Sequence, residues 1–389
     1  MSVHQGDERA ATRTTSAVVG CTSDGRQYPF GVERIGLVGL PNSGKSSLFN
    51  SLTGGSAPVA SHPFSTTETS TGVAQVPDHR LDALAVMSSS RKVIHAGVEL
   101  VDVAGLVAGA STGEGLGNRF LGGIREADAI CLVLRAFDDP NVPGGSDPLE
   151  DLTVLELELV LADLASAETQ LERRRKAAKQ DRSLSGEVAV LEKAHGLLAD
   201  GIPLYRSGLT NEEREQLRPF FMLTNKPVLA VVNLGEDVVG DDASLVKPVV
   251  DELGRAAEVL GVSVKLEAEA AQLPAEDRAE LLEGLGLGEG ALPRVAQAAY
   301  RLLGRRTFFT TGDKESRAWT FKAGAKAPEC AGVIHSDLQR GFIRAEVVHW
   351  DELLALGSWS AAREAGKLRV EGKEYEVIDG DVLEIRFNV

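Results

Sequence analysis

The sequence has few cysteines and no long apolar run. Its 389 residues include only Cys21, Cys131 and Cys330, which lie far apart and form no C-x-x-C pair. This spacing excludes a disulfide-rich scaffold and a zinc site built from thiolates. No apolar stretch approaches the roughly 20 residues that a membrane-spanning helix requires. We therefore expect a chain that works in a reducing compartment and does not associate with a membrane.

Basic residues are also fewer than acidic ones. The chain has 41 lysines and arginines against 57 aspartates and glutamates, which gives a formal net charge of −16. Such a balance disfavours binding to DNA, although it permits local basic patches. Asp7 and Glu8 stand early in an N-terminus that lacks the apolar core of a secretory signal. We expect a cytoplasmic protein in which residues 1–32 form a flexible extension.

Short apolar runs dominate the first two thirds of the chain. Helical stretches separate these runs, a pattern typical of an α/β fold with a parallel sheet. The length allows two to three domains at roughly 150 residues each. The runs that we expect to form buried strands are 34–39, 98–103, 129–134 and 228–232.

A long helical insert precedes the last of these strands. Two leucine-rich stripes, separated by a polar break, predict an antiparallel helical hairpin. Glu168 and His195 interrupt the stripes, and we interpret them as tolerated polar breaks. The tip falls near 173–185, and 172–182 contains six basic and two acidic residues. The stripes consist of Leu157, Leu161, Leu164 and Leu171, followed by Leu184, Val188, Leu191 and Leu198.

From Thr307 onward the sequence changes to strands and turns. Residues 368–377 alternate around a Glu-Gly-Lys turn, and Asp379-Gly-Asp precedes a closing strand at 382–387. These features predict a small α+β domain of about 80 residues. Eight basic and five acidic residues occur in 305–350, so this part is locally basic, like the hairpin tip. Both regions are candidates for contact with RNA or another polyanion, or are ordinary solvated surface.

The segment Gly39-Leu-Pro-Asn-Ser-Gly-Lys45-Ser46 fits the phosphate-binding pattern G-x-x-x-x-G-K-[ST]. It follows a predicted strand and opens a predicted helix, as a P-loop requires. Glycines allow the backbone N–H groups to surround phosphates, Lys45 supplies a positive charge, and the Ser46 hydroxyl is a Mg²⁺ ligand. We therefore predict a nucleoside-triphosphate site here.

Two further segments complete the expected phosphate and metal site. Asp102 ends a predicted strand, where a carboxylate holds Mg²⁺ through water, and the Gly105 N–H can face a γ-phosphate. A second Mg²⁺-binding hydroxyl is expected between these elements. Thr66 and Thr67 both fit that role on chemistry alone.

The base-recognition segment departs from the guanine-specific pattern Asn-Lys-x-Asp. Asn225-Lys226 lacks the aspartate and precedes its strand, whereas Asn233-Leu-Gly-Glu236 follows the strand at 228–232. The longer carboxylate fits the paired donors of guanine less well, which favours adenine.

Residues 35–389 resemble the YchF/Obg-like ATPase family, and the resemblance rests on several specific motifs. It covers nearly everything but the N-terminal extension. The motifs are Gly39-Leu-Pro-Asn-Ser-Gly-Lys-Ser-Ser-Leu-Phe-Asn, Val76-Pro-Asp-His-Arg-Leu-Asp, the stretch from Asp102 to Asn118, Arg317-Ala-Trp-Thr, Gly332-Val-Ile-His-Ser-Asp, Arg340-Gly-Phe-Ile-Arg-Ala-Glu and Arg386-Phe-Asn-Val.

The resemblance implies a P-loop G domain at 33–147 and 220–304, a helical insert at 148–219 and a β-grasp TGS domain at 305–389. It also implies ATP preferred over GTP, slow hydrolysis, and association with the ribosome, as a subunit or a 70S-type particle. Ser46, Thr66 and Asp102 would hold Mg²⁺, and Asn42 would coordinate K⁺, which would act as an activator. Asn233, Leu234 and Glu236 would contact adenine. The phosphates would lie against Asn42, Ser43, Gly44, Lys45, Ser46 and Ser47.

The catalytic group implied by this resemblance is Lys45, Gly105 and Leu106. Leu106 stands where related enzymes orient water with glutamine, and a leucine cannot do so. His62 departs from the usual pattern of its segment, and we interpret it as a surface or packing residue. Residues 138–148 contain no histidine, so no role of a histidine in that region is carried over. Two alternatives stay open: an Obg-type GTPase of ribosome assembly, and a nucleotide-gated regulatory binding protein in which hydrolysis is incidental.

Overall fold

The computed structural model describes residues 34–55, 70–103, 116–139, 145–238, 243–285, 287–288 and 290–388. The N-terminal segment 1–32, Thr66, Gly105 and Leu106 lie outside these ranges, so the expectations about them stay predictions. In the described part, no helix is both long and apolar enough to span a membrane.

The first sheet has six strands in the order β2-β4-β1-β5-β6-β7. All neighbouring pairs are parallel except β2 with β4, so the sheet is mixed rather than wholly parallel. An antiparallel edge strand needs no crossover back to the same end of the sheet, which allows this one exception. The strands are β1 (Arg34–Val38), β2 (Ser70–Val76), β4 (Ala96–Asp102), β5 (Ala129–Ala136), β6 (Val228–Leu234) and β7 (Ala257–Val262).

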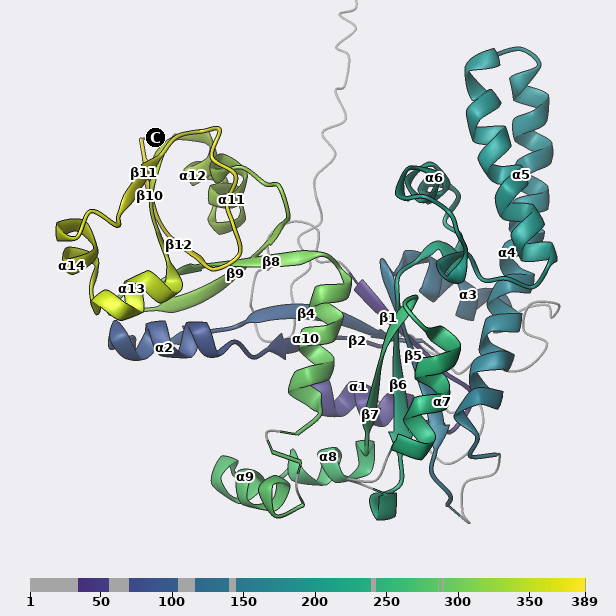
Figure 1. Cartoon of the computed structure of the whole chain (residues 1–389), viewed down its shortest axis with the longest axis horizontal. Helices are drawn as coiled ribbons and strands as arrows, with labels where there is room; N and C mark the ends of the chain where they lie inside the picture. The colour runs from purple at the N-terminus through teal and green to yellow at the C-terminus, as the bar shows by residue number, and fades with distance from the viewer. Residues whose placement is uncertain are drawn as a thin grey trace, which may run out of the picture.

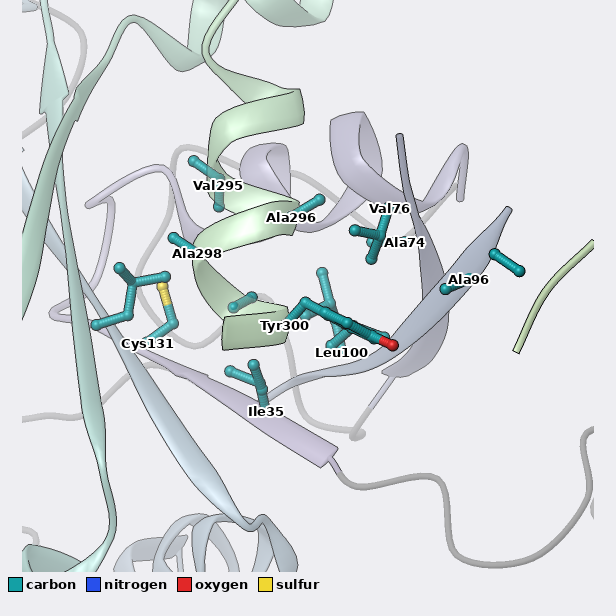
Figure 2. Close-up of a cluster of buried hydrophobic side chains, with 14 of the residues drawn as sticks. Ile35, Ala74, Val76, Ala96, Leu100, Cys131, Val295, Ala296, Ala298 and Tyr300 are labelled. Carbon is teal, nitrogen blue, oxygen red and sulfur yellow. The ribbon is translucent and has the colours of Figure 1, made fainter. Parts of the chain in front are cut away.

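Alternate residues of the central strands enter two apolar clusters, one on each face of this sheet. In β5, Cys131 and Val133 face one cluster, and Leu132 and Leu134 face the other. Figure 2 shows the first cluster, where Val295 and Ala298 lie above Ile35 and Cys131. Helices α1 (Lys45–Thr53), α2 (His79–Met87) and α10 (Leu292–Leu302) contribute to this cluster, and α3 (Leu116–Glu126), α4 (Pro148–Ala178) and α7 (Ala243–Leu253) contribute to the other.

Helix α4 leaves the sheet and pairs with α5 (Ser185–Ala199) as a projecting hairpin (Figure 1). The tip is closed by a short 3-10 turn, η1 (Arg182–Leu184), which Asp181 caps. His195 Nε2 lies 3.7 Å from Glu168 Oε1 across the hairpin. The base of the hairpin is completed by η2 (Leu204–Arg206), α6 (Asn211–Leu217), η3 (Arg218–Phe220) and η4 (Leu223–Asn225).

The predicted stripe on α4 is partly wrong. Leu171 is buried, but Leu157 and Leu161 are 53% and 38% exposed. The reason is that α4 has two partners: Leu155 and Leu159 face the sheet, whereas the distal half packs on α5. The buried face therefore turns along the helix, and no single stripe continues from base to tip. Val160, Ala167 and Leu171 meet Leu191, Ala194 and Leu198 of α5.

The second sheet has the order β11-β10-β12-β8-β9-β3. Phe308 and Trp319 stack in its core at a ring-centroid distance of 6.3 Å, and Cys330 is fully buried beside them. The strands are β3 (Val93–Ile94), β8 (Arg305–Thr310), β9 (Ser316–Lys322), β10 (Phe342–His349), β11 (Arg369–Glu371) and β12 (Asp381–Phe387). The helices are α11 (Ala327–Ile334), α12 (Ser336–Arg340), α13 (Trp350–Leu356) and α14 (Trp359–Glu364).

The two sheets are joined by the segment between β2 and β4. Strand β3 belongs to this segment but pairs with β9. Helix α2 lies against α13 (Figure 1), and Arg80 bonds both Asp78 and Asp379 while its guanidinium lies 5.1 Å from the Phe309 ring centroid. The second sheet is therefore anchored on a segment of the first half of the chain, and its assignment as a TGS domain stays a prediction.

Candidate nucleotide-binding site

The loop between β1 and α1 adopts a conformation that only certain residues permit. Gly44 has φ +90°, and a Cβ at this position would lie 2.1 Å from Nδ2 of Asn233. A Cβ on Gly39 would lie 2.6 Å from the carbonyl oxygen of Val133. Asn42 also has a positive φ, 66°, which asparagine tolerates better than most residues. Both glycines are thus required for the close approach of this loop to neighbouring strands.

Helix α1 begins at Lys45, as the motif predicts, and its first turn is open for an anion. Gly44 supplies no side-chain cap, and the first turn contains no acidic residue. The first N–H groups of a helix have no partner within the helix, and they carry the positive end of its dipole. This end of α1 can therefore bind a phosphate through its backbone.

Lys45, Ser46 and Asp102 meet at the carboxyl ends of β1 and β4. Ser46 Oγ donates a hydrogen bond of 2.6 Å to Asp102 Oδ2, and Lys45 Nζ lies 3.7 Å from Oδ1. Asp102 is fully buried and Lys45 nearly so. Burial lowers the pKa of Lys45, and the nearby Asp102 carboxylate opposes that shift. The sequence predicted these three residues, and the fold places them together.

The donor set at Asp102 suits Mg²⁺. Oδ1 of Asp102 is buried and accepts no hydrogen bond within the described residues, so it has room for a further electropositive partner. Carboxylate, hydroxyl and phosphate oxygens are the ligands that Mg²⁺ prefers, usually with several waters. No group of three His, Cys, Asp or Glu side chains converges in the described ranges, which is compatible with a metal held largely by phosphate and water. The residues present therefore fit this ion.

Asn233 ties the phosphate loop to the end of β6. Its Nδ2 donates to the carbonyl oxygen of Ser43 at 2.9 Å, and its Oδ1 accepts from the N–H of Val264 at 3.2 Å. The side chain is buried, so these two bonds fix its orientation. Asn233 thus positions the loop, and its expected contact with a base stays a prediction.

Glu236 lies beyond Asn233 and is accessible. It begins the 3-10 turn η5 (Glu236–Val238), its side chain is 41% exposed, and its Oε2 lies 3.0 Å from Nζ of Lys265. The ion pair raises the pKa of Lys265. Leu234 is buried in the core, so only its backbone is available to a ligand. Glu236 is therefore the accessible side chain of this motif, and its expected contact with a base stays a prediction.

Sequence reasoning missed two partners of this motif. Val264 and Lys265 begin helix α8 (Val264–Ala270), directly after β7, and they bond Asn233 and Glu236 respectively. No motif in the sequence around Val264 and Lys265 marks them, because the contact depends on the pairing of β6 with β7. Ser43 was predicted, and its buried hydroxyl has no partner among the described residues.

The alternative segment Asn225-Lys226 has a structural role. Asn225 Nδ2 donates to the carbonyl oxygen of Arg214 at 3.0 Å. Lys226 Nζ donates to the carbonyl oxygens of Arg125 and Ala127. These bonds lie at the start of β6, whereas Asn233 lies near its carboxyl end. The segment is thus at the wrong edge of the sheet for nucleotide contact.

Comparisons with known proteins agree with this geometry. Residues 306–388 match the family YchF-GTPase_C, described as a protein of unknown function, and residues 34–161 match the family described as 50S ribosome-binding GTPase. The relative from Bacillus subtilis, named ribosome-binding ATPase YchF, is 46% identical over 361 residues, covering 91% of this chain and 99% of the relative. The relative of the same name from Haemophilus influenzae is 44% identical, covering 92% and 99%.

A solved structure extends the likeness to the fold. The structure of the Schizosaccharomyces pombe YchF GTPase superposes with a TM-score of 0.80 at 32% identity, covering 92% of this chain and 98% of that one. The likeness spans nearly the whole of each chain. On this identity and coverage, the chain belongs to the YchF family of nucleotide-hydrolysing P-loop proteins.

Proposed function

We propose that this protein is a Mg²⁺-dependent ATPase that converts ATP to ADP and phosphate, and acts as a nucleotide-gated switch on the ribosome in the cytoplasm. The contact of Lys45 and Ser46 with the buried Asp102 carries the proposal, because it joins a phosphate-binding loop to a metal-binding carboxylate. The Bacillus and Haemophilus relatives, named ribosome-binding ATPases, support ATP as the nucleotide and the ribosome as the partner.

The phosphates would lie against the first turn of α1. The N–H groups of residues 44–47 would point at the anion, whereas the Ser43 N–H already donates to the carbonyl oxygen of Leu40. The Lys45 ammonium would neutralise charge on the β- and γ-phosphates. Ser46, Asp102 (through water) and Thr66 would hold Mg²⁺, which neutralises further negative charge when bound. Asn42 would coordinate K⁺ as an activator. Lys45 is the catalytic cation of this scheme.

Water attack on the γ-phosphate would proceed without a side chain that orients the water. Gly105 would donate its N–H to the γ-phosphate, and Leu106 would cover the site without a hydrogen bond to water. A leucine in this role predicts slow turnover, to be raised by the ribosome or by K⁺. Loss of the γ-phosphate would release the segments that contain Thr66 and Gly105, and this release is the switch.

Base selection would rest on Glu236. The exposed carboxylate can accept a hydrogen bond from the adenine N6 amino group, whereas guanine presents two donors whose geometry suits the shorter aspartate. The ion pair with Lys265 holds one carboxylate oxygen at 3.0 Å and leaves the other for the base. Burial of Asn233 and Leu234 supports their role as the frame for this contact.

Ribosome contact would involve the hairpin tip and the C-terminal sheet. At the tip, Arg174 and Arg175 already pair with Glu187 and Glu192 of α5. In the described part of the chain, Arg173, Lys179 and Arg182 pair with no carboxylate, so they are the cations best able to meet RNA phosphates. Charge reversal at these three positions should reduce co-sedimentation with ribosomes, and Arg218→Glu, at an exposed site outside the hairpin, is the matched control.

A GTPase is the second candidate function. The Schizosaccharomyces pombe protein and the family matched by residues 34–161 are both named GTPases. A third possibility, a regulatory binding protein with incidental hydrolysis, follows from Leu106. It predicts negligible turnover even with ribosomes and K⁺ present.

The first experiment is a competition titration. A fluorescent ATP analogue bound to the full chain with Mg²⁺ is displaced by unlabelled ATP or GTP. Selective displacement by ATP supports Glu236 as the adenine reader, and equal or better displacement by GTP overturns the ATPase assignment. Glu236→Gln is the matched variant, because it keeps the shape of the side chain and replaces one carboxylate oxygen with an N–H donor.

A further inference from the structure

Strand β9 has an open edge in the second sheet. It pairs with β8 along its whole length, but on its other side β3 pairs only with Ser316 and Arg317. Among the described residues, no strand pairs with the outer side of residues 318–322. Ala318 and Trp319 are buried and β4 contacts β9, so the accessible part of this edge is residues 320–322. A strand of this kind presents unpaired backbone groups, to which another extended segment can bond.

The backbone groups of Thr320 point toward this open side. Thr320 lies opposite Thr307 of β8. Thr307 turns both its backbone groups away from β9, because its N–H donates to Asp379 Oδ1 and its carbonyl oxygen accepts from Gly380. In an antiparallel pair of this type, both residues direct their N–H and C=O groups outward. Ser316 has the same place as Thr320 in the alternation along β9. Its N–H also points away from β8, because it donates to the carbonyl oxygen of Lys92 on the outer side.

A pocket of about 450 Å³ lies beside the same edge. This volume is within the roughly 300–1,000 Å³ typical of ligand pockets. Its floor is apolar, because Phe321 and Cys330 are buried there. Thr320 and Phe321, neighbours on opposite faces of β9, line it together with residues of α11 and α12, so the pocket reaches the edge of the strand.

The rim of the pocket is cationic. Lys322 is exposed and has no carboxylate partner among the described residues, and Arg305 stands opposite it in the ladder. The one acidic side chain of the lining, Glu329, is already engaged, since its Oε2 accepts from the Lys326 N–H at 2.7 Å. A ligand with an acidic residue next to an apolar one is therefore favoured over a cationic ligand.

We propose that β9 binds an extended acidic peptide of a partner protein as an added strand. The peptide backbone bonds the N–H and C=O of Thr320, an apolar side chain enters the pocket, and an acidic side chain pairs with Lys322. The peptide lies along residues 320–322, C-terminal to the stretch of β9 that pairs with β3. Strand addition of this kind gains affinity from main-chain bonds and specificity from alternate side chains.

The probe is a fluorescently labelled heptapeptide of alternating valine and glutamate, titrated into the full chain and followed by anisotropy. Two further peptides carry N-methyl groups on one or on the other set of alternate residues, which removes the donors of one edge in each peptide and leaves charge and side chains unchanged. We expect binding to weaken at least tenfold when the N-methylated edge is the one that faces β9. Because this comparison leaves the protein unaltered, its result does not depend on how a variant folds.

Two protein variants localise the binding. Thr320→Pro removes the outward N–H and breaks no bond to β8, and it should abolish binding. Thr320→Val, which loses only the hydroxyl that accepts from Tyr300, is the matched control and should bind normally. Lys322→Glu should weaken binding at least fivefold, whereas Lys314→Glu, in the turn at the other end of β9, should not. A thermal melt of each variant confirms folding.

Other outcomes overturn the proposal. One is the absence of saturable binding by the probe. Another is equal binding of the N-methylated peptides together with displacement by oligouridylate, which would identify the pocket as an RNA site. Retained nucleotide binding in Thr320→Pro separates this test from that of the proposed ATPase, because the phosphate loop lies on the first sheet.

Discussion

The nucleotide edge of the first sheet and the tip of the hairpin both place a cation beside a carboxylate, but in opposite environments. Lys45 and Asp102 are buried, and Asp102 Oδ1 has no hydrogen bond among the described residues. Arg175 and Glu192 are about half exposed and hydrogen-bonded to each other. Exposed pairs contribute little to stability, whereas buried charges are costly to separate. The difference supports our proposal that the buried pair is the one organised for a ligand.

The largest effect is expected at Lys45. Lys45→Met should reduce the rate constant of ATP hydrolysis by roughly 10²–10³, because it removes a fixed charge from the phosphate site. Single-turnover phosphate release measures it. Lys176→Met, at an exposed pair with Glu172, is the hairpin control and should leave the rate unchanged. Equal rates for Lys45→Met and wild type would contradict the assigned role.

The next effect is expected at Asn233. Asn233→Asp replaces the amide donor with an acceptor facing the carbonyl oxygen of Ser43, in a buried position. An unsatisfied buried group costs about 1–3 kcal/mol, so the free energy of unfolding should fall by about 2 kcal/mol and nucleotide affinity should fall with it. Urea unfolding and nucleotide titration measure the two. Asn225→Asp, whose amide donates to Arg214 at the other edge, should leave affinity unchanged.

A smaller effect is expected at Glu236. Glu236→Asp should shift the ratio of ATP to GTP affinity toward GTP by about tenfold. One well-placed contact with a base contributes about 1–3 kcal/mol of discrimination, which is an effect of this size. Competition titration measures the ratio. Stability should not change, because the side chain is exposed. Asp237→Glu, at the neighbouring exposed residue, is the control, and a shift there of the same size would assign base selection to the whole turn.

The smallest effect is expected at the hairpin. Arg175→Ala should lower the free energy of unfolding by less than about 1 kcal/mol, since both members of its pair are solvent-accessible. Chemical denaturation at two salt concentrations measures it, and the effect should shrink at high salt. A loss above about 2 kcal/mol would mean that the hairpin pairs are not ordinary surface contacts, and the comparison with Lys45 would fail.

The sequence predicted the phosphate loop well because its signal is local. Glycines, a lysine and a serine at fixed spacing specify the turn between a strand and a helix, and helix α1 does begin at Lys45. Asp102 was also predicted, since it ends an apolar run, and the fold places it beside Ser46. The hairpin was predicted as a pair of helices, but its buried face was assigned to Leu157 and Leu161, which are exposed. Helical spacing does not reveal that one helix packs on two different partners.

What the sequence by itself determined is the order of the elements and the residues of the phosphate loop, because backbone conformation and apolar periodicity act over a few residues. Tertiary structure decided the rest. It set the antiparallel direction of β2, the recruitment of β3 into the second sheet, and the contacts of Asn233 with Ser43 and Val264. Each of these contacts depends on strand pairing or packing between segments that are distant in the chain, and local preference does not encode such pairing.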